Sequence, residues 1–193
     1  CRHRRLRDGA GGVSSAATKG AAVQKFSPIP EFTQVTPTAE IRTSAHGWRA
    51  KCLQRLIRLD LPVPPTVALP AMTVRNIAAG HAMDTRAILR FFGDAPLVSV
   101  RPSPENPDWG GPGTVLNVGM NAARHAALTA SHGSEAADTI YLRFVQGYAT
   151  HVARLDPDMF EFGKPSASAL RDALRQYERE MDEPFPEDPA RQL

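Results

Sequence analysis

The residue with the most evident chemistry is Arg101, which follows a short apolar run at 97–100 and enters a loop rich in proline and glycine. A second apolar run, 114–118, follows the loop, and β-branched runs of this length predict buried strands. An arginine at a strand end is suited to binding an anion, because its planar guanidinium pairs with phosphate or carboxylate through two hydrogen bonds. The pattern by itself favours a plainer alternative, a structural ion pair with Glu105 or Asp108.

Helices must position this loop, and their pattern predicts the fold class. Helical spacing of apolar or alanine residues marks helices at 44–60, 72–92, 121–132, 136–155 and 166–181. Asp84 or Thr85 is predicted to cap a helix inside the second of these, and Ser166 or Ser168 to cap the last. The four prolines of 61–70 predict a rigid extended connection. We therefore expect an α/β (α+β) protein with helices packed on a small sheet.

Composition changes near residue 43 and separates two regions. Residues 1–43 are rich in Gly, Ala, Ser, Thr and Pro and lack periodicity, which predicts a disordered or loosely packed segment. Residues 44–193 are long enough for one domain with a core. The net charge of +3 is mild, and its basic run at the start is typical of a solvated terminus.

Other bulk features concern compartment and partners. The sequence has no apolar run of membrane-spanning length and no signal-peptide pattern. Its two cysteines provide neither a disulfide framework nor a metal cluster. We therefore expect a cytoplasmic protein that binds neither membrane nor nucleic acid, with no metal site made by its own residues.

Four stretches, in order along the chain, resemble the N-terminal ATP-binding region of pyruvate, phosphate dikinase. They are LDLPVPPTVALP at 59–70, VSVR with TVLN thirteen residues after its arginine, YLRFVQGYATHVARLDPDMFE at 141–161 and EPFPEDPARQL at 183–193. The resemblance covers about 45–193, which is most of the chain. It implies an ATP-grasp-type nucleotide-binding domain that is incomplete in this chain, because the match ends before the half that supplies acidic magnesium ligands.

The resemblance also implies site residues and cofactors. Arg101 matches the arginine that grips ATP phosphates, and an ungapped count places Arg49 on a phosphate-binding lysine of the family. These two residues are the catalytic candidates. The nucleotide-binding candidates are Arg49, Arg101, Gly110, Gly111, Gly113 and Thr114. ATP and Mg²⁺ are the implied cofactors, although the implied metal ligands lie outside this chain.

The sequence departs from the family pattern at the implied site. Trp48 replaces a glycine beside Arg49, and arginine is not equivalent to lysine at a close phosphate contact. Proline and serine replace small residues at 102–104, and Glu105 replaces a basic residue. A carboxylate about 4 Å from a phosphate charge opposes binding by roughly 4 kcal/mol at an effective dielectric constant of about 20. A magnesium ion would instead use such carboxylates as ligands through water.

Two functions from different classes remain open. In the first, the chain is the ATP-binding N-terminal part of a phosphotransferase that interconverts ATP, phosphate and pyruvate with AMP, diphosphate and phosphoenolpyruvate. Its partners would be a nucleotide and the remainder of the enzyme. In the second, the nucleotide site has decayed and the chain is a non-catalytic interaction module. Whether it is an enzyme stays open at this point, and we expect the chain alone to be inactive because positioning groups are missing.

Overall fold

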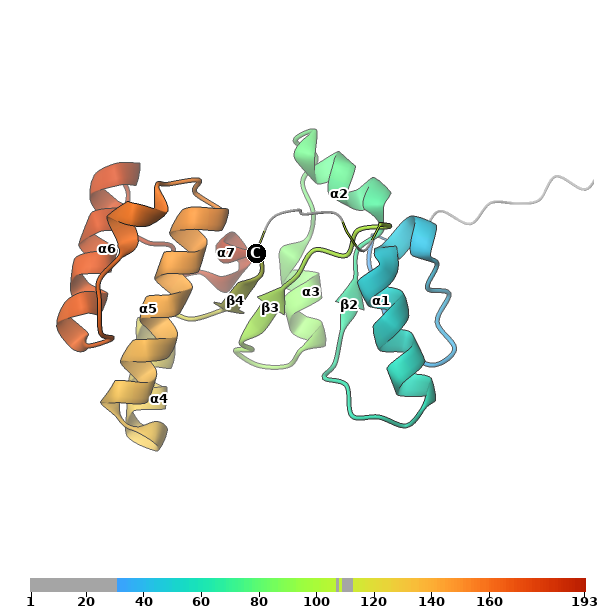
Figure 1. Ribbon diagram of the computed structural model, residues 1–193, viewed down its shortest axis with the longest axis horizontal. Helices are drawn as coiled ribbons and strands as arrows, with labels where there is room; N and C mark the ends of the chain where they lie inside the picture. The colour runs from blue at the N-terminus through green and yellow to red at the C-terminus, as the bar shows by residue number, and fades with distance from the viewer. Residues whose placement is uncertain (1–30, 107, 109–112) are drawn as a thin grey trace, which may run out of the picture.

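The computed structural model describes residues 31–106, 108 and 113–193, and this part of the chain is an α+β fold with two small antiparallel sheets. The elements in chain order are β1 (Thr33–Gln34), α1 (Thr43–Arg58), β2 (Val67–Ala68), α2 (Ala71–Ala78), α3 (Thr85–Phe91), β3 (Val98–Val100), β4 (Val115–Val118), α4 (Ala122–His132), α5 (Ser134–His151), the 3₁₀ turn η1 (Pro157–Phe160), α6 (Ala167–Met181) and α7 (Pro189–Gln192). No helix among these residues combines the length and apolar character that a membrane span requires. The helices α4, α5 and α6 lie at one end of the molecule and α1 at the other, with the β3–β4 hairpin between them (Figure 1).

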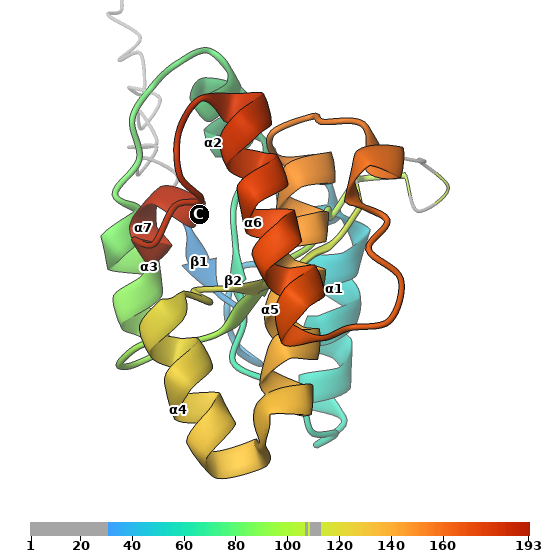
Figure 2. The same cartoon turned by 90° about the vertical axis from the view of Figure 1, so that its left-hand side faces the viewer.

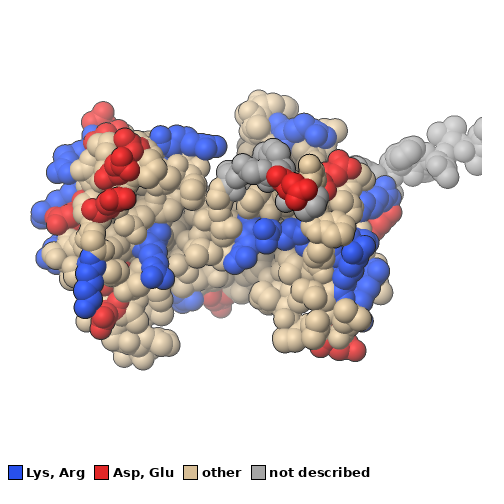
Figure 3. Space-filling model, viewed as in Figure 1, with Lys and Arg blue, Asp and Glu red and all other residues tan. Residues whose placement is uncertain are grey.

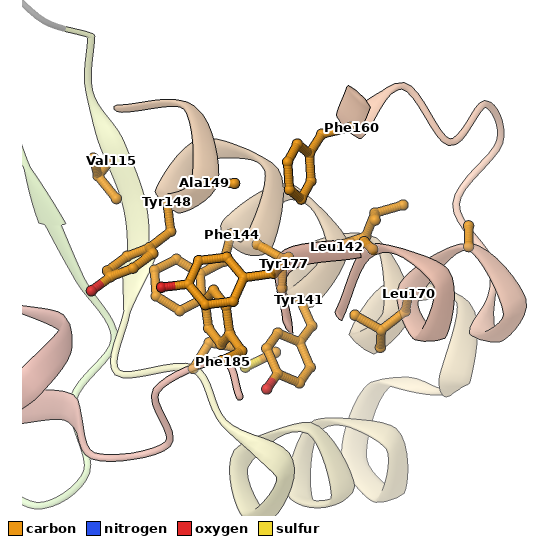
Figure 4. Packing of buried hydrophobic residues seen from close by; sticks show 14 of the residues in the cluster. Val115, Tyr141, Leu142, Phe144, Tyr148, Ala149, Phe160, Leu170, Tyr177 and Phe185 are labelled. Atoms are coloured by element: carbon orange, nitrogen blue, oxygen red, sulfur yellow. The ribbon is translucent and has the colours of Figure 1, made fainter. Parts of the chain in front are cut away.

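The main hydrophobic core is built on α5, which packs against α4, α6 and β4 (Figure 2). Its buried positions include Tyr141, Phe144, Val145 and Tyr148, whose spacing of three or four places them on one helical face. Phe185, from the segment after α6, inserts among the aromatic rings of this face (Figure 4). The core therefore closes only when the end of the chain folds back onto α5.

The strands β3 and β4 form an antiparallel hairpin in which Val98 faces Val118 and Val100 faces Val115, with an irregularity between the two pairs. Both predicted strands are present, but the expectation that both are buried is wrong. Val115 and Val118 of β4 are buried in the main core, whereas Val100 of β3 is 43% exposed. The helix α5 packs directly on β4, and β3 is the outer strand of the pair, so Val100 stays exposed although it pairs with the buried Val115.

The first described residues correct the boundary predicted at residue 43. Thr33–Gln34 pairs with Val67–Ala68, and the Val35 amide donates a 2.9 Å hydrogen bond to the Thr66 carbonyl. Val35 and Ile41 are buried in a second core, formed with Ala50 and Ala68. Residues 33–41 are therefore packed rather than loose, because they cover the apolar face of α1. The predicted disorder of residues 1–30 lies outside the described residues.

The predicted helices are present with changed bounds. The segment 72–92, expected to be helical, is two helices, α2 and α3, separated by a turn at Gly80 with φ 88°. Asp84 caps α3 by accepting a hydrogen bond from the Ala87 amide, and Ser166 caps α6 in the same way, as the sequence predicts. The helix expected from residue 136 begins earlier, at Ser134, and its N-cap is Gly133.

The chain end is fixed by Gln192, which is buried in the short helix α7. Its side-chain nitrogen donates to the carbonyls of Met120 and Pro186, at 2.8 and 2.7 Å, and its oxygen accepts from the Gly119 amide at 2.7 Å. All three partners are backbone groups that burial would otherwise leave without hydrogen bonds. Gln192 thus ties α7 to the turn between β4 and α4, and it holds the base of the hairpin in place.

Candidate functional site

The head of α1 is bent at Gly47, whose φ of 78° and ψ of 172° are not helical. A regular helix therefore starts at Trp48. A Cβ atom at position 47 would lie 1.5 Å from the carbonyl oxygen of Ser103, so no other residue fits without a shift of the backbone. The bend brings the start of the helix against the segment that leaves β3.

Three hydrogen bonds fix this contact between residues more than 50 apart in the sequence. The Trp48 amide donates to the Pro104 carbonyl at 2.7 Å. The Ser103 hydroxyl accepts from the Ala50 amide at 3.1 Å and donates to the His46 carbonyl at 2.7 Å. Ser103 thus caps the helix from another part of the chain. The amides of Trp48 and Ala50 are used internally, so an anion near this helix must be held mainly by side chains.

Of the two predicted phosphate-binding residues, Arg49 contacts the backbone of the segment that follows Arg101. The Arg49 Nε donates a 3.0 Å hydrogen bond to the carbonyl of Pro102, the residue that follows Arg101. Both arginines are exposed. Among the described residues Arg101 forms no ion pair, so the predicted structural alternative with Glu105 or Asp108 is not formed. Lys and Arg side chains, drawn in blue, lie in the middle of the face shown in Figure 3.

The other side of the hairpin end is formed by Gly113 and Thr114, which lead into β4. Thr114 is half-buried and Gly113 is exposed. A Cβ atom at position 113 would lie 2.6 Å from Nε2 of His151, so the imidazole lies directly against this glycine. Gly110 and Gly111, also predicted to contact nucleotide, lie outside the described residues.

A buried histidine lies next to the bend in α1. The side chain of His46 is only 6% exposed, and its Nδ1 accepts a 3.2 Å hydrogen bond from the Arg42 amide. Its Nε2 is buried without a hydrogen-bond partner among the described residues. Burial lowers the pKa of His46, because the protonated ring loses more hydration than the neutral ring. The ring is therefore a neutral packing element at neutral pH.

Metal ligands are sparse in the part of the chain that the structure describes. No group of three His, Cys, Asp or Glu side chains is placed to hold a metal ion there. Glu105 and Asp108 are both exposed beyond Arg101. These two carboxylates are available to contact a hydrated Mg²⁺ carried by a nucleotide, but they do not form a metal site by themselves.

A second polar cluster lies on α4 and α5, away from the arginines, and serves the fold. The buried carboxylate of Asp138 pairs with His125 at 2.7 Å, which joins α5 to α4. The Tyr141 hydroxyl donates to Glu187 at 3.2 Å. Burial, with the negative charge of Glu187 as a further cause, raises the pKa of Tyr141, so its hydroxyl stays protonated. The cluster connects three segments of the chain, and its polar groups are used in holding them together.

Sequence reasoning gave no site role to three residues that shape the candidate site: Gly47, Ser103 and His151. Gly47 lies inside the helix predicted at 44–60, and a glycine within a helical pattern was an available signal of a break, since glycine readily adopts an unusual φ. Ser103 and His151 gave none, because their partners lie far away in the sequence. Comparison of the sequence with models of known protein families and with curated proteins finds no match.

The geometry thus defines one end of a hairpin at which Arg101 is exposed and the side chain of Arg49, also exposed, reaches the backbone of the next residue, Pro102. Guanidinium groups remain charged at all physiological pH values and bind phosphate oxygens through paired N–H donors. The exposed guanidinium groups are therefore suited to binding a polyanion.

Proposed function

We propose that this chain is the ATP-binding N-terminal portion of a phosphotransferase similar to pyruvate, phosphate dikinase, and that its fold is part of an ATP-grasp-type domain. The complete enzyme would interconvert ATP, phosphate and pyruvate with AMP, diphosphate and phosphoenolpyruvate. In this proposal, Arg101 and Arg49 bind the phosphates of the nucleotide, with Gly113 and Thr114 at the edge of the site.

One observation carries the proposal: the hydrogen bond from Arg49 to the Pro102 carbonyl at 3.0 Å. The four-segment resemblance assigns phosphate contacts to Arg49 and Arg101 separately, although they are far apart in the sequence. A coincidental resemblance gives no reason for these two residues to be neighbours. A shared phosphate-binding role, by contrast, requires them to lie close together, as they do at one hairpin end.

The described residues fit the phosphates of ATP better than they fit its metal ion. Two exposed guanidinium groups provide the charge and the N–H donors that a polyphosphate needs. The same described region holds no set of three metal ligands. Mg²⁺ would therefore arrive with the nucleotide, and it would screen the phosphates from the carboxylates of Glu105 and Asp108.

Calorimetric titration of Mg·ATP into the isolated chain tests the proposal. Arg101→Ala should weaken binding by about 1.5–3 kcal/mol, as for the loss of a charge-assisted hydrogen bond. The midpoint of thermal unfolding without ligand should change little, because Arg101 is exposed and forms no ion pair among the described residues.

The matched control is Arg171→Ala. Arg171 is exposed on α6 and forms no ion pair with another described residue, so its loss removes the same charge at a distance from the hairpin. Its effect on affinity should be small. Unchanged Mg·ATP affinity in a folded Arg101→Ala protein would remove the phosphate role from this residue and overturn the proposal.

A second candidate function, a non-catalytic interaction module, is favoured by a different observation. Two amides at the head of α1 are bound by Ser103 and Pro104, and Trp48 occupies space beside Arg49. The indole of Trp48 also lies under the Arg55 guanidinium, 5.1 Å from its ring centre. Absence of any heat of binding for Mg·ATP, with a folded chain, would favour this function over the first.

A further inference from the structure

His151, at the last position of α5, occupies the space where a side chain at position 113 would lie. A Cβ atom on Gly113 would be 2.6 Å from Nε2 of His151 and 2.7 Å from its Cε1. Real Cβ atoms do not approach other heavy atoms this closely, so the ring and the glycine are matched in shape. The edge of the imidazole that carries Nε2 therefore lies at the hairpin end rather than in the main core.

The register of the hairpin shows which other residues share this end. Val100 faces Val115, so Arg101 is the first residue beyond that pair on one strand and Thr114 the first on the other. Gly113 and Pro102 come next on their respective strands. Arg49 of α1 contacts Pro102, Arg101 directly precedes Pro102, and His151 of α5 contacts Gly113, so each of these three basic residues touches or adjoins the hairpin end.

The imidazole has unused hydrogen-bonding capacity. His151 is half-buried, and neither ring nitrogen forms a hydrogen bond or an ion pair with another described residue. A neutral imidazole has one N–H donor, and a phosphate oxygen is a strong acceptor. An aliphatic side chain of similar size would pack against Gly113 equally well. Histidine additionally places a ring nitrogen at the hairpin end, where it can contact a bound anion.

We propose that His151 is a third phosphate-binding side chain of this site, whose imidazole N–H donates to an oxygen of the polyphosphate held by Arg101 and Arg49. This inference rests on the proposed function, because it assumes that a polyphosphate binds at the hairpin end. It adds a contact from α5, and therefore links the anion site directly to the helix on which the main core is built.

The experiment measures binding of inorganic triphosphate and of Mg·ATP by calorimetry, at one fixed pH and ionic strength. His151→Ala should weaken both by roughly tenfold, the usual result of losing one hydrogen bond to a charged group. His151→Gln should retain most of the affinity, since its amide supplies an N–H donor at a similar distance from the backbone. Thermal unfolding of each variant reports whether the fold is intact.

Gly113→Ala supplies an independent test through the same contact. The added methyl group must displace the imidazole, so this variant should lose about as much affinity as His151→Ala. In a His151→Ala background the methyl group has room, and Gly113→Ala should then have little further effect. Such non-additivity is specific to two residues in contact. A backbone effect of the glycine substitution would instead persist in the double variant and would count against the contact.

The outcomes separate this inference from the proposed function. Weaker binding by Arg101→Ala together with unchanged binding by His151→Ala overturns the role of His151 and leaves the nucleotide site in place. Equal loss in His151→Ala and His151→Gln, with both proteins folded, overturns the donor role. A wild-type chain that binds neither triphosphate nor Mg·ATP overturns both proposals.

Discussion

The aromatic core and the arginine-bearing junction hold their elements together in opposite ways. In the core, Phe185 lies edge-on to Phe144, Tyr148 and Tyr177, with ring centres 5.0–5.4 Å apart. At the junction between α1 and the end of β3, hydrogen bonds to residues 102–104 make the contact, and the arginine there is exposed. One region excludes water, and the other presents charge to it.

The aromatic core therefore mainly determines the stability of the fold, and the exposed arginines mainly determine what the chain can bind. Burial of apolar area stabilises a fold by roughly 25 cal/mol per Å², whereas an exposed hydrogen bond contributes little. Burial in the core also raises the pKa of Tyr177 to about 12, so its hydroxyl stays neutral. We therefore expect substitutions in the core to unfold the protein and substitutions of exposed arginines to change binding alone.

The largest expected effect is that of Phe185→Ala. The side chain is 6% exposed and contacts rings from both α5 and α6, so its removal leaves a cavity that these helices cannot easily fill. The free energy of unfolding should fall by about 3–5 kcal/mol. Chemical denaturation monitored by circular dichroism measures this change.

Met159→Ala is the matched control, because Met159 is a large apolar side chain that is already 38% exposed. Its loss should change stability by no more than about 0.5 kcal/mol. Equal effects of the Met159 and Phe185 substitutions would contradict the distinction between a cavity-sensitive core and a tolerant surface.

A smaller loss of stability is expected at the junction for Gly47→Ala. A φ of 78° with a ψ of 172° costs a non-glycine residue about 1–3 kcal/mol, and the added Cβ must also move the Ser103 carbonyl, 1.5 Å away. Gly133→Ala is the control, because Gly133 has a similar φ of 86° and ψ of 159°, and a Cβ atom there would meet no heavy atom within 4 Å. The control should therefore show the cost of the backbone conformation alone.

The difference between these two glycine variants isolates the contact with Ser103. Gly47→Ala should be the more destabilising by at least about 1 kcal/mol, and it should also weaken Mg·ATP binding because Arg49 loses its position on Pro102. Denaturation and calorimetry on the two variants measure these changes. Equal losses of stability would show that the close approach of α1 to the loop contributes nothing.

Local patterns predicted most of the helices, and the reason is physical. Helical spacing and caps involve residues within a few positions of each other, so Asp84 and Ser166 were identifiable from the sequence as caps of α3 and α6. The predicted cap at Asp84 implied a helix start inside 72–92, but the end of α2 near Gly80 was missed because apolar residues continue on both sides of that glycine. Glycine at that point was the available signal.

Local sequence patterns could not predict contacts between residues that lie far apart in the sequence. The burial of Val35 and Ile41 depends on α1 and β2, which supply the rest of that core. The exposure of Val100 depends on the packing of α5 against β4 rather than β3, and a β-branched run has the same composition in either strand. Both errors therefore arose where tertiary packing decides the outcome.

The residues of the candidate site also fall into two groups: those that the sequence identifies and those that only tertiary contacts reveal. Arg101 was identifiable by its place after an apolar run, and Arg49 only through the family resemblance. The Ser103 side chain caps α1 by accepting a hydrogen bond from the amide of Ala50, 53 positions earlier in the sequence. Gly113 and His151 are likewise far apart in the sequence, because β4, α4 and nearly all of α5 lie between them. No periodicity or turn rule relates residues at such separations.

The smallest expected effect concerns His46, which lies in the junction but is buried like a core residue. Burial lowers its pKa below the ordinary value of 6.5. Above pH 6.5 the ring is neutral in both the folded and the unfolded chain, so it has no effect on the pH dependence of stability. Below that value the unfolded chain binds a proton that the folded chain resists, and the free energy of unfolding should fall until the pH also passes the folded pKa.

The variant His46→Asn makes this prediction measurable, because asparagine keeps an acceptor for the Arg42 amide near the position of Nδ1 and cannot titrate. One titrating group changes stability by at most about 1.4 kcal/mol per pH unit. Denaturation of both proteins across the acid range should therefore show a steeper loss of stability in the wild-type chain. Parallel curves would mean that His46 is hydrated in the folded state, and that the junction is as open to water around this ring as it is around its arginines.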